Sequence, residues 1–213
     1  MLFARTAFID LLQNREYSLH DRLVNVLSAS AEIQYALDEE DTEEIKAIAQ
    51  ELSHPEIIAE RVESLKKALP EKPLENAENM LLYLERLDFI GDILPQQIKD
   101  ASRFVKKLSA PLKAQTSGEY EKLAVYFVYR YFLKAVRNFD LMSKIKAMIV
   151  FVFAAEVINL SREQDAHARF ETVKELCKEI EYSGDNMDRI YDDSYLSDIF
   201  SDISMLALLE WTL

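Results

Sequence analysis

The amino-acid sequence predicts an all-α protein, a bundle of about eight or nine helices with no sheet. Three observations lead to this prediction. The 213 residues include only 3 Gly and 5 Pro, too few turn-forming residues for a protein built from many short strands. Apolar residues recur three and four positions apart along most of the chain, which is the spacing of one helix face. Hydrophobic residues make up 49% of the chain, enough for a sizeable core.

Helix-start signals mark the first half of the chain. Ser18 followed by Asp21 is a loose capping box. The six acids among residues 38–44 stand where carboxylates stabilise a helix N-terminus, and the segment lacks the turn glycine of a calcium loop. Pro55 fits the first turn of a helix. The helices expected here are 2–13, 19–37, one that includes Ile45 and Ile48, 55–69, 74–90 and 96–108.

Small and helix-breaking residues gather at 109–118, and this segment is the candidate internal boundary of a single all-α domain over residues 1–213. Beyond it, Ser161 and Gln164 form the capping box expected to start a helix. The helices expected in this half are 119–136, 141–159, 162–182, a short turn at 187–191 and a last helix at 195–211.

The segments 119–136 and 141–159 are expected to pair as an antiparallel hairpin, because the connection between them is short. Apolar residues cover most of the circumference of 119–136, which is typical of a central helix. Counting outward from the turn places Arg130 level with about Met148, so no acid faces Arg130 across the hairpin.

A cation on such a helix extends to solvent, pairs with an acid from a third helix, or binds an anionic group. The first two alternatives are the common ones. The third makes Tyr126, Tyr129 and Arg130 a candidate ligand-binding or partner-binding site. Glu156, set in an apolar run, is added to this site as the candidate partner of a buried cation.

The net charge of −13 comes from 38 acids against 25 bases, and such a charge disfavours nucleic-acid binding. The C-terminal region concentrates acids around a single base, Arg189. A lysine-rich partner would find a docking surface there, although a solvated rim is the common explanation for such acids. The candidate docking residues are Asp185, Asp188, Asp192 and Asp193.

No metal or cofactor site is expected in this chain. Cys177 is the only cysteine, which excludes an internal disulfide, a four-cysteine zinc site and a self-contained iron–sulfur cluster. Glu51 and His54 match one E-x-x-H element of a di-iron bundle, but the second element is absent. We expect His20, His54 and His167 to be ordinary surface or capping residues.

The most apolar run, residues 147–155, has nine residues, whereas a membrane-spanning helix needs about 20. The N-terminal residues also lack the apolar segment of a signal peptide. We therefore expect no membrane association and a cytoplasmic location.

Three segments resemble the C-terminal helical region of bacterial flagellin lysine N-methylase-like proteins: residues 11–34, 125–150 and 177–192. The resemblance implies a helical accessory or substrate-docking domain that serves protein-lysine methylation. It implies flagellin, or the catalytic portion, as the protein partner. The chemistry of that family is associated with a cysteine-rich N-terminal portion that holds an iron–sulfur centre, which this chain does not contain. We therefore expect no methyl transfer from this chain alone.

A stand-alone helical protein-interaction or ligand-sensing module is the alternative. Its pocket would lie near Tyr126, Tyr129 and Arg130. The sequence does not indicate the oligomeric state.

Overall fold

The computed structural model describes residues 1–68, 72–113, 118–162 and 165–212. These residues form helices and include no strand, so the all-α prediction is confirmed. The count of eight or nine helices was too low. The α-helices are α1 (Leu2–Gln13), α2 (Leu19–Asp38), α3 (Thr42–Glu51), α4 (Pro55–Ala68), α5 (Pro73–Leu84), α6 (Ile93–Val105), α7 (Gly118–Tyr131), α8 (Ala135–Asn138), α9 (Met142–Arg162), α10 (Ala166–Leu176), α11 (Gly184–Leu196) and α12 (Asp202–Leu209).

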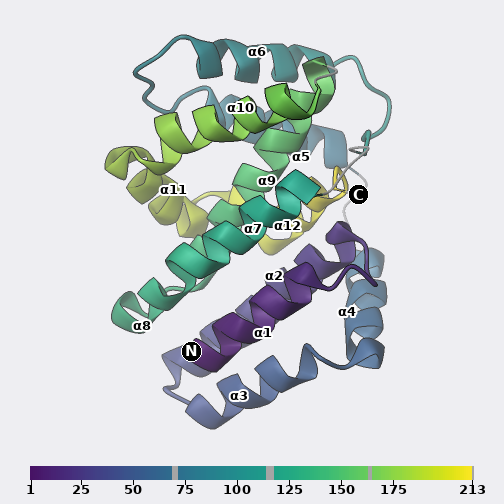
Figure 1. Ribbon diagram of the computed structural model, residues 1–213, viewed down its shortest axis with the longest axis vertical. Coiled ribbons are helices and arrows are strands. Elements are labelled where there is room, and N and C mark those ends of the chain that lie inside the picture. The colour runs from purple at the N-terminus through teal and green to yellow at the C-terminus, as the bar shows by residue number, and fades with distance from the viewer. Residues whose placement is uncertain (69–71, 114–117, 163–164, 213) are drawn as a thin grey trace.

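Helix α9 is the centre of the structure (Figure 1), and α2, α6, α7, α10, α11 and α12 all pack against it. Every residue from Met142 to Asn159 is buried, because helices surround α9 on all sides and most of its residues are apolar. The prediction that 119–136 is the central helix was wrong. Helix α7 covers one side of α9 and leaves Tyr129 and Arg130 exposed.

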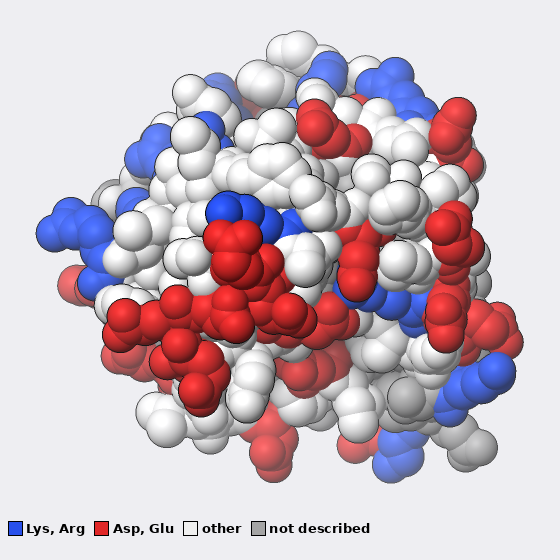
Figure 2. Space-filling view, turned by 90° about the horizontal axis from the view of Figure 1, so that it is seen from below, with Lys and Arg blue, Asp and Glu red and all other residues white. Residues whose placement is uncertain are grey.

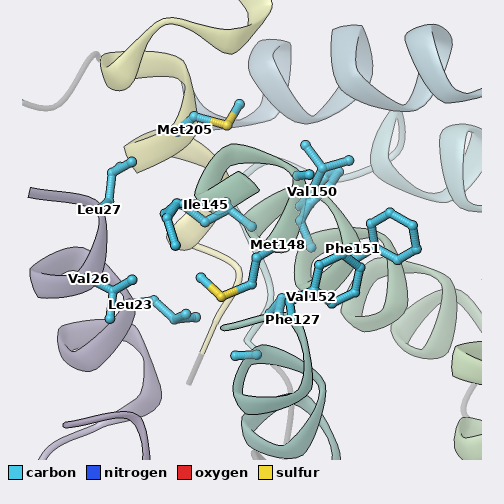
Figure 3. Close-up of a cluster of buried hydrophobic side chains, with 14 of the residues drawn as sticks. Leu23, Val26, Leu27, Phe127, Ile145, Met148, Val150, Phe151, Val152 and Met205 are labelled. Carbon is cyan, nitrogen blue, oxygen red and sulfur yellow. The ribbon is translucent and has the colours of Figure 1, made fainter. Parts of the chain in front are cut away.

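Side chains from several helices meet around α9 to form the core (Figure 3). Met148 and Val152 of α9 lie among Leu23 of α2, Phe127 of α7 and Met205 of α12, and all of them are buried. One contiguous apolar cluster includes residues from both sides of the candidate boundary at 109–118. Residues 114–117 of that boundary lie outside the described residues, and the single-domain assignment stays a prediction.

The expected hairpin is present, since α7 packs along α9 and the Phe127 and Phe151 rings lie 4.6 Å apart. The first helix of the hairpin is shorter than expected. It ends at Tyr131 and continues as a 3₁₀ turn over Phe132–Lys134 and then as α8. The chain reverses at Phe139, which has a left-handed backbone with φ of 53°.

Helix starts in the N-terminal half were identified correctly. The Ser18 hydroxyl accepts the Asp21 N–H at 3.0 Å, and the Asp41 carboxylate accepts the N–H groups of Glu43 and Glu44. Pro55 begins α4. The expected end of this helix, Leu69, lies outside the described residues. Helix α5 ends six residues before the expected residue 90, and α6 starts three residues before the expected 96.

The expected capping box of Ser161 and Gln164 was wrong. Ser161 lies inside α9, where its hydroxyl donates to the Ile158 carbonyl, and Gln164 lies outside the described residues. Asp165 caps α10 instead, because its carboxylate accepts the Ala168 N–H at 2.9 Å.

The C-terminal segments also differ from the prediction. The turn expected at 187–191 belongs to the full helix α11, and the helix expected at 195–211 breaks into a 3₁₀ turn (Asp198–Phe200) and α12. The Ser201 hydroxyl caps α12 by accepting the Ser204 N–H. Ser197 and Ser201 flank the 3₁₀ turn and separate α11 from α12. The apolar pattern had predicted one continuous helix here.

Histidine placement differs from the prediction at one position. His54 and His167 are exposed or partly exposed, as expected. His20 is buried, with its ring nitrogens 3.0 Å from Asp21 and 3.4 Å from Glu210. His20 lies against the C-terminal residue Glu210, and the sequence around His20 does not indicate this long-range contact.

Candidate functional site

Arg130 has a partner on a third helical segment, which is one of the alternatives that the sequence left open. Its Nε lies 3.2 Å from Glu181 Oε1. The Glu181 side chain is fully buried, whereas the Arg130 side chain is 44% exposed. The acid that pairs with Arg130 therefore comes from the segment that follows α10, not from the other helix of the hairpin.

Three tyrosine rings surround the Arg130 guanidinium. Its Cζ lies 5.7 Å from the Tyr126 ring centroid, 5.5 Å from Tyr131 and 5.6 Å from Tyr182. Each distance is within the range of a cation–π contact. We call Tyr126, Arg130, Tyr131, Glu181 and Tyr182 together the Glu181 site.

The Glu181 carboxylate is held by hydroxyl donors as well as by the cation. Tyr126 donates to Glu181 Oε1 at 2.8 Å, and Tyr131 donates to the same oxygen through a short hydrogen bond. The other oxygen, Oε2, is buried and has no hydrogen-bond partner in the part of the chain that the structure describes. One carboxylate oxygen therefore has three polar partners and the other has none.

A π-helical segment places Glu181 in this position. Residues Cys177–Glu181 continue α10 with a wider turn, and the Tyr182 N–H donates to the Cys177 carbonyl at 2.9 Å, five residues back. A π turn inserts one residue into a helix and changes the direction of the side chains that follow, often at functional sites. Here it directs Glu181 inward and Tyr182 toward solvent.

The groups around Glu181 stay protonated at neutral pH. Burial, and then the hydrogen bond to Glu181, raise the pKa of the Tyr126 and Tyr131 hydroxyls above the ordinary value. Burial and the neighbouring Glu181 carboxylate raise the pKa of the Cys177 thiol to about 12. Cys177 is therefore a thiol rather than a thiolate, and a thiol is neither a good nucleophile nor a metal ligand.

A groove of about 650 Å³ runs between α7 and α10 and reaches the Glu181 site. Leu123, Phe170 and Val173 make its surface largely apolar. Its full lining is Glu119, Lys122, Leu123, Tyr126, Phe170, Val173, Lys174, Cys177, Lys178 and Tyr182.

Two of the residues that the sequence assigned to this site lie elsewhere. The Tyr129 ring points to α1, with the Arg5 guanidinium 5.3 Å from its centroid. Glu156 is completely buried near the end of the chain, where Thr212 Oγ1 donates to its Oε2 at 2.8 Å. Burial raises the pKa of Glu156 well above its ordinary value. Its direct hydrogen-bond partner is a hydroxyl, and the role of Glu156 as partner of a buried cation stays a prediction.

The candidate docking acids lie on α11, directly after the Glu181 site. Asp185, Asp188 and Asp192 are exposed and have no ion pair among the described residues. Their spacing of three and four puts them on one side of the helix. We call these three residues the α11 acidic face. Asp193 is half-buried and lies 3.7 Å from Arg189, so it is already paired.

A second acidic region lies around the start of α3. Figure 2 shows acidic side chains gathered on the face that carries α3 at the bottom of Figure 1. The exposed acids of this region are Asp38, Glu39, Glu40, Asp41, Glu43 and Glu44. Sequence reasoning assigned part of this run to a helix N-terminus, which accounts for Asp41, Glu43 and Glu44 but not for the acids before them.

The described residues contain no group of three or more His, Cys, Asp or Glu side chains arranged to hold a metal ion. Glu51 instead pairs with Arg61 at 3.0 Å. Among the described helices, none has both the length and the apolar character to cross a membrane.

Comparison with known proteins gives one family. The pattern of the FliB lysine N-methylase C-terminal domain matches residues 5–208. Searches of curated proteins and of solved structures give no match. The match covers nearly the whole chain, including all three segments that carry the resemblance. The chain therefore belongs to the FliB lysine N-methylase C-terminal domain family and is related to flagellin lysine N-methylases.

Proposed function

We propose that this chain is the flagellin-docking part of a flagellin lysine N-methylase and does not transfer methyl groups by itself. The observation that carries the proposal is the α11 acidic face, Asp185, Asp188 and Asp192, which makes no ion pair within the described part of the chain and lies next to the Glu181 site. Lysine residues are the targets of such an enzyme, so a docking surface must attract and accept cationic segments.

Charge supports this role in two ways. A net charge of −13 increases the encounter rate with a cationic partner, and it does so most strongly at low ionic strength. Unpaired carboxylates on one helix face then provide specific partners for lysine side chains. Acids that already have a cation, such as Asp193 with Arg189, contribute less.

The chemistry of the available groups supports the non-catalytic part of the proposal. Cys177 is the only cysteine and its pKa is about 12, so it does not supply a thiolate. The iron–sulfur chemistry implied by the family resemblance belongs to a cysteine-rich portion that these residues do not include. The catalytic portion is then a second partner of this chain.

Binding of purified flagellin to this chain, measured by calorimetry at several salt concentrations, tests the docking role. We expect affinity that falls steeply with salt. The Asp185→Asn, Asp188→Asn, Asp192→Asn triple variant should lose about tenfold or more of the affinity, since each desolvated charge contact contributes on the order of 1 kcal/mol.

The matched control is the triple variant Glu39→Gln, Glu40→Gln, Glu44→Gln, which removes the same charge from the α3 region. We expect it to change the affinity about twofold or less, through the long-range field alone. Equal losses from the two triple variants would show that net charge, not the α11 acidic face, attracts flagellin, and would contradict the proposal. Absence of binding at low salt would also contradict it.

A stand-alone ligand-binding module is the second candidate, and the apolar groove between α7 and α10 favours it. A volume of about 650 Å³ is in the range of small-molecule sites. A small apolar ligand that copurifies with the chain and contacts Phe170 or Val173 would support this function over flagellin docking.

A further inference from the structure

The Glu181 site has the composition of a cage for an organic cation. Three aromatic faces from Tyr126, Tyr131 and Tyr182 surround one point, and the Glu181 carboxylate lies beside it. Aromatic rings attract a cation through the negative potential of their faces, and such cages recognise methylated ammonium groups. In this structure the Arg130 guanidinium occupies the position between the three rings where such a cation would bind.

Arg130 is suited to leave this position. Its side chain is 44% exposed, so the guanidinium would move into water that it already contacts. A single nitrogen, Nε, lies within 3.2 Å of the carboxylate, rather than the two-pronged arrangement of a strong arginine–carboxylate pair. Lys134, whose Nζ is 4.4 Å from the Tyr131 centroid, is a second cation held by the same aromatic group.

Glu181 retains capacity for another donor. Its Oε2 is buried without a hydrogen-bond partner among the described residues. A buried acceptor without a donor is costly, and a ligand that supplies the donor removes that cost. Displacement of Arg130 would also remove its Nε donor from Oε1, so the displacing ligand should carry both positive charge and an N–H group.

We propose that Tyr126, Tyr131, Tyr182 and Glu181 form a binding site for a methylated lysine side chain, and that Arg130 is the resident cation that this side chain displaces. Mono- and dimethyl-lysine fit the chemistry best. They combine apolar methyl groups for the rings with an N–H for Glu181. Trimethyl-lysine keeps the charge but has no N–H, and unmethylated lysine is more strongly hydrated.

The groove between α7 and α10 extends this site. Leu123, Phe170 and Val173 offer an apolar surface for residues that flank the modified lysine. Of the rim lysines, Lys174 and Lys178 already pair with Glu171 and Glu175, at 2.7 and 3.3 Å. The rim of the groove is therefore close to neutral, and ligand specificity depends on the Glu181 site.

The inference rests on the proposed function in one respect, the origin of the ligand, because a lysine N-methylase produces methylated lysine. The binding chemistry itself depends only on the Glu181 site. A domain that holds the methylated product would keep flagellin bound between successive methylations.

The test uses this chain and acetylated, amidated lysine whose side-chain nitrogen carries zero, one, two or three methyl groups. Binding is followed by NMR, because methyl protons between tyrosine rings shift upfield. We expect the mono- and dimethyl forms to bind more tightly than the unmethylated and trimethyl forms. Arg130→Ala should tighten their binding about tenfold, since the competing cation–π contacts of Arg130 are removed.

Tyr182→Ala should weaken binding about tenfold through the loss of one ring. The matched control is Tyr129→Ala: both tyrosines are 65% exposed, but Tyr129 faces Arg5. The proposal is overturned if neither wild type nor Arg130→Ala prefers methylated lysine, or if Tyr129→Ala weakens binding as much as Tyr182→Ala. Because Tyr182 is exposed, its replacement leaves the fold intact even if variants of buried Glu181 do not fold.

The flagellin-binding assay separates this inference from the proposed function. Unmethylated flagellin should still bind Tyr182→Ala with the same salt dependence, because the α11 acidic face is unchanged. If wild-type chain and Arg130→Ala bind flagellin but show no preference for methyl-lysine, only the inference is overturned. Loss of docking with intact methyl-lysine binding overturns only the proposed function.

Discussion

The Arg22 guanidinium donates to Glu121 Oε2 at 2.9 Å and joins α2 to α7 inside the core. Arg22 is 2% exposed and also donates to the Leu12 and Ser18 carbonyls. Arg15 reaches the same carboxylate from the surface, with Nη2 2.9 Å from Oε1. Burial acts to raise the pKa of Glu121, but the hydrogen bonds from the two arginines outweigh it and lower that pKa.

Replacing Glu121 with alanine should destabilise the protein by about 3–5 kcal/mol, because the buried Arg22 charge loses its counter-charge. Urea unfolding followed by circular dichroism measures this free energy of unfolding. Arg15→Ala is the control that removes the exposed arm of the same network. It should cost about 1 kcal/mol or less, since Arg15 is 72% exposed. Equal costs for the two variants would show that the burial of Arg22 is not decisive.

Glu156 makes stability depend on pH in a predictable direction. Its folded-state pKa is raised, so the folded protein keeps a proton that the unfolded chain releases above a pH of about 4.3. Wild-type stability should therefore fall as pH rises above this value, by up to about 1.4 kcal/mol per pH unit until Glu156 ionises in the folded state. Glu156→Gln removes this dependence.

Wild type and Glu156→Gln should differ little in stability near pH 4, and Glu156→Gln should be the more stable protein at pH 7. Thermal unfolding across this pH range, with Glu60→Gln as an exposed control, measures the difference. A constant difference between the two proteins across the range would contradict a protonated Glu156.

Asn186 and Glu179 attach the loop before α6 to the C-terminal helices. The Asn186 side chain accepts the Asp88 N–H at 3.0 Å and donates to the Asp88 carbonyl at 2.7 Å, while Glu179 accepts the N–H groups of Ile90 and Gly91. Asn186→Ala should cost about 1–3 kcal/mol, because partly buried backbone groups of Asp88 lose their partners.

Amide hydrogen exchange locates the effect of Asn186→Ala. Protection should fall at Asp88 and its neighbours before it falls in α9, whose exchange requires global unfolding. A uniform loss of protection in both regions would mean that Asn186 acts on the whole fold rather than on the loop.

Cys177 should react slowly with thiol reagents in the folded protein. With a pKa of about 12, its thiolate fraction at pH 8 is far below that of a free cysteine. Iodoacetamide modification, followed by mass spectrometry, should be at least about 100-fold slower in native buffer than in urea. Equal rates in the two conditions would show that the thiol is exposed and ionised.

Local sequence signals were sufficient for most of the fold. Periodicity identified the long helices, and short-range chemistry identified the caps at Ser18 and Asp41 and the proline at the start of α4. Errors occurred where two signals compete. Ser161 resembles a cap but lies inside α9, because the apolar face of that helix continues past it to Arg162.

The candidate site could be predicted only in part. Tyr126 and Arg130 were identified because a cation on an apolar helix needs a partner. Glu181 was missed because it lies about 50 residues away and its inward direction depends on a π turn, which has no clear local signature. Tyr182 was missed for the same reason, since the segment that carries Glu181 also brings the Tyr182 ring to Arg130. Tyr131 was missed because its contacts with Arg130 and Glu181 are not visible in helical spacing. Tyr129 lies apart from the Glu181 site, against Arg5, and helical spacing alone does not show which neighbour covers each face.

The π turn at Cys177–Glu181 ties the site to the number of residues in the chain as well as to their identity. Deleting one residue between Leu176 and Glu181 would restore an ordinary α-helix and rotate the carboxylate about 100° around the helix axis, away from Tyr126 and Tyr131. Family members with this arrangement are thus recognisable by a shared segment length, and a one-residue gap in that segment would mark members that have lost it.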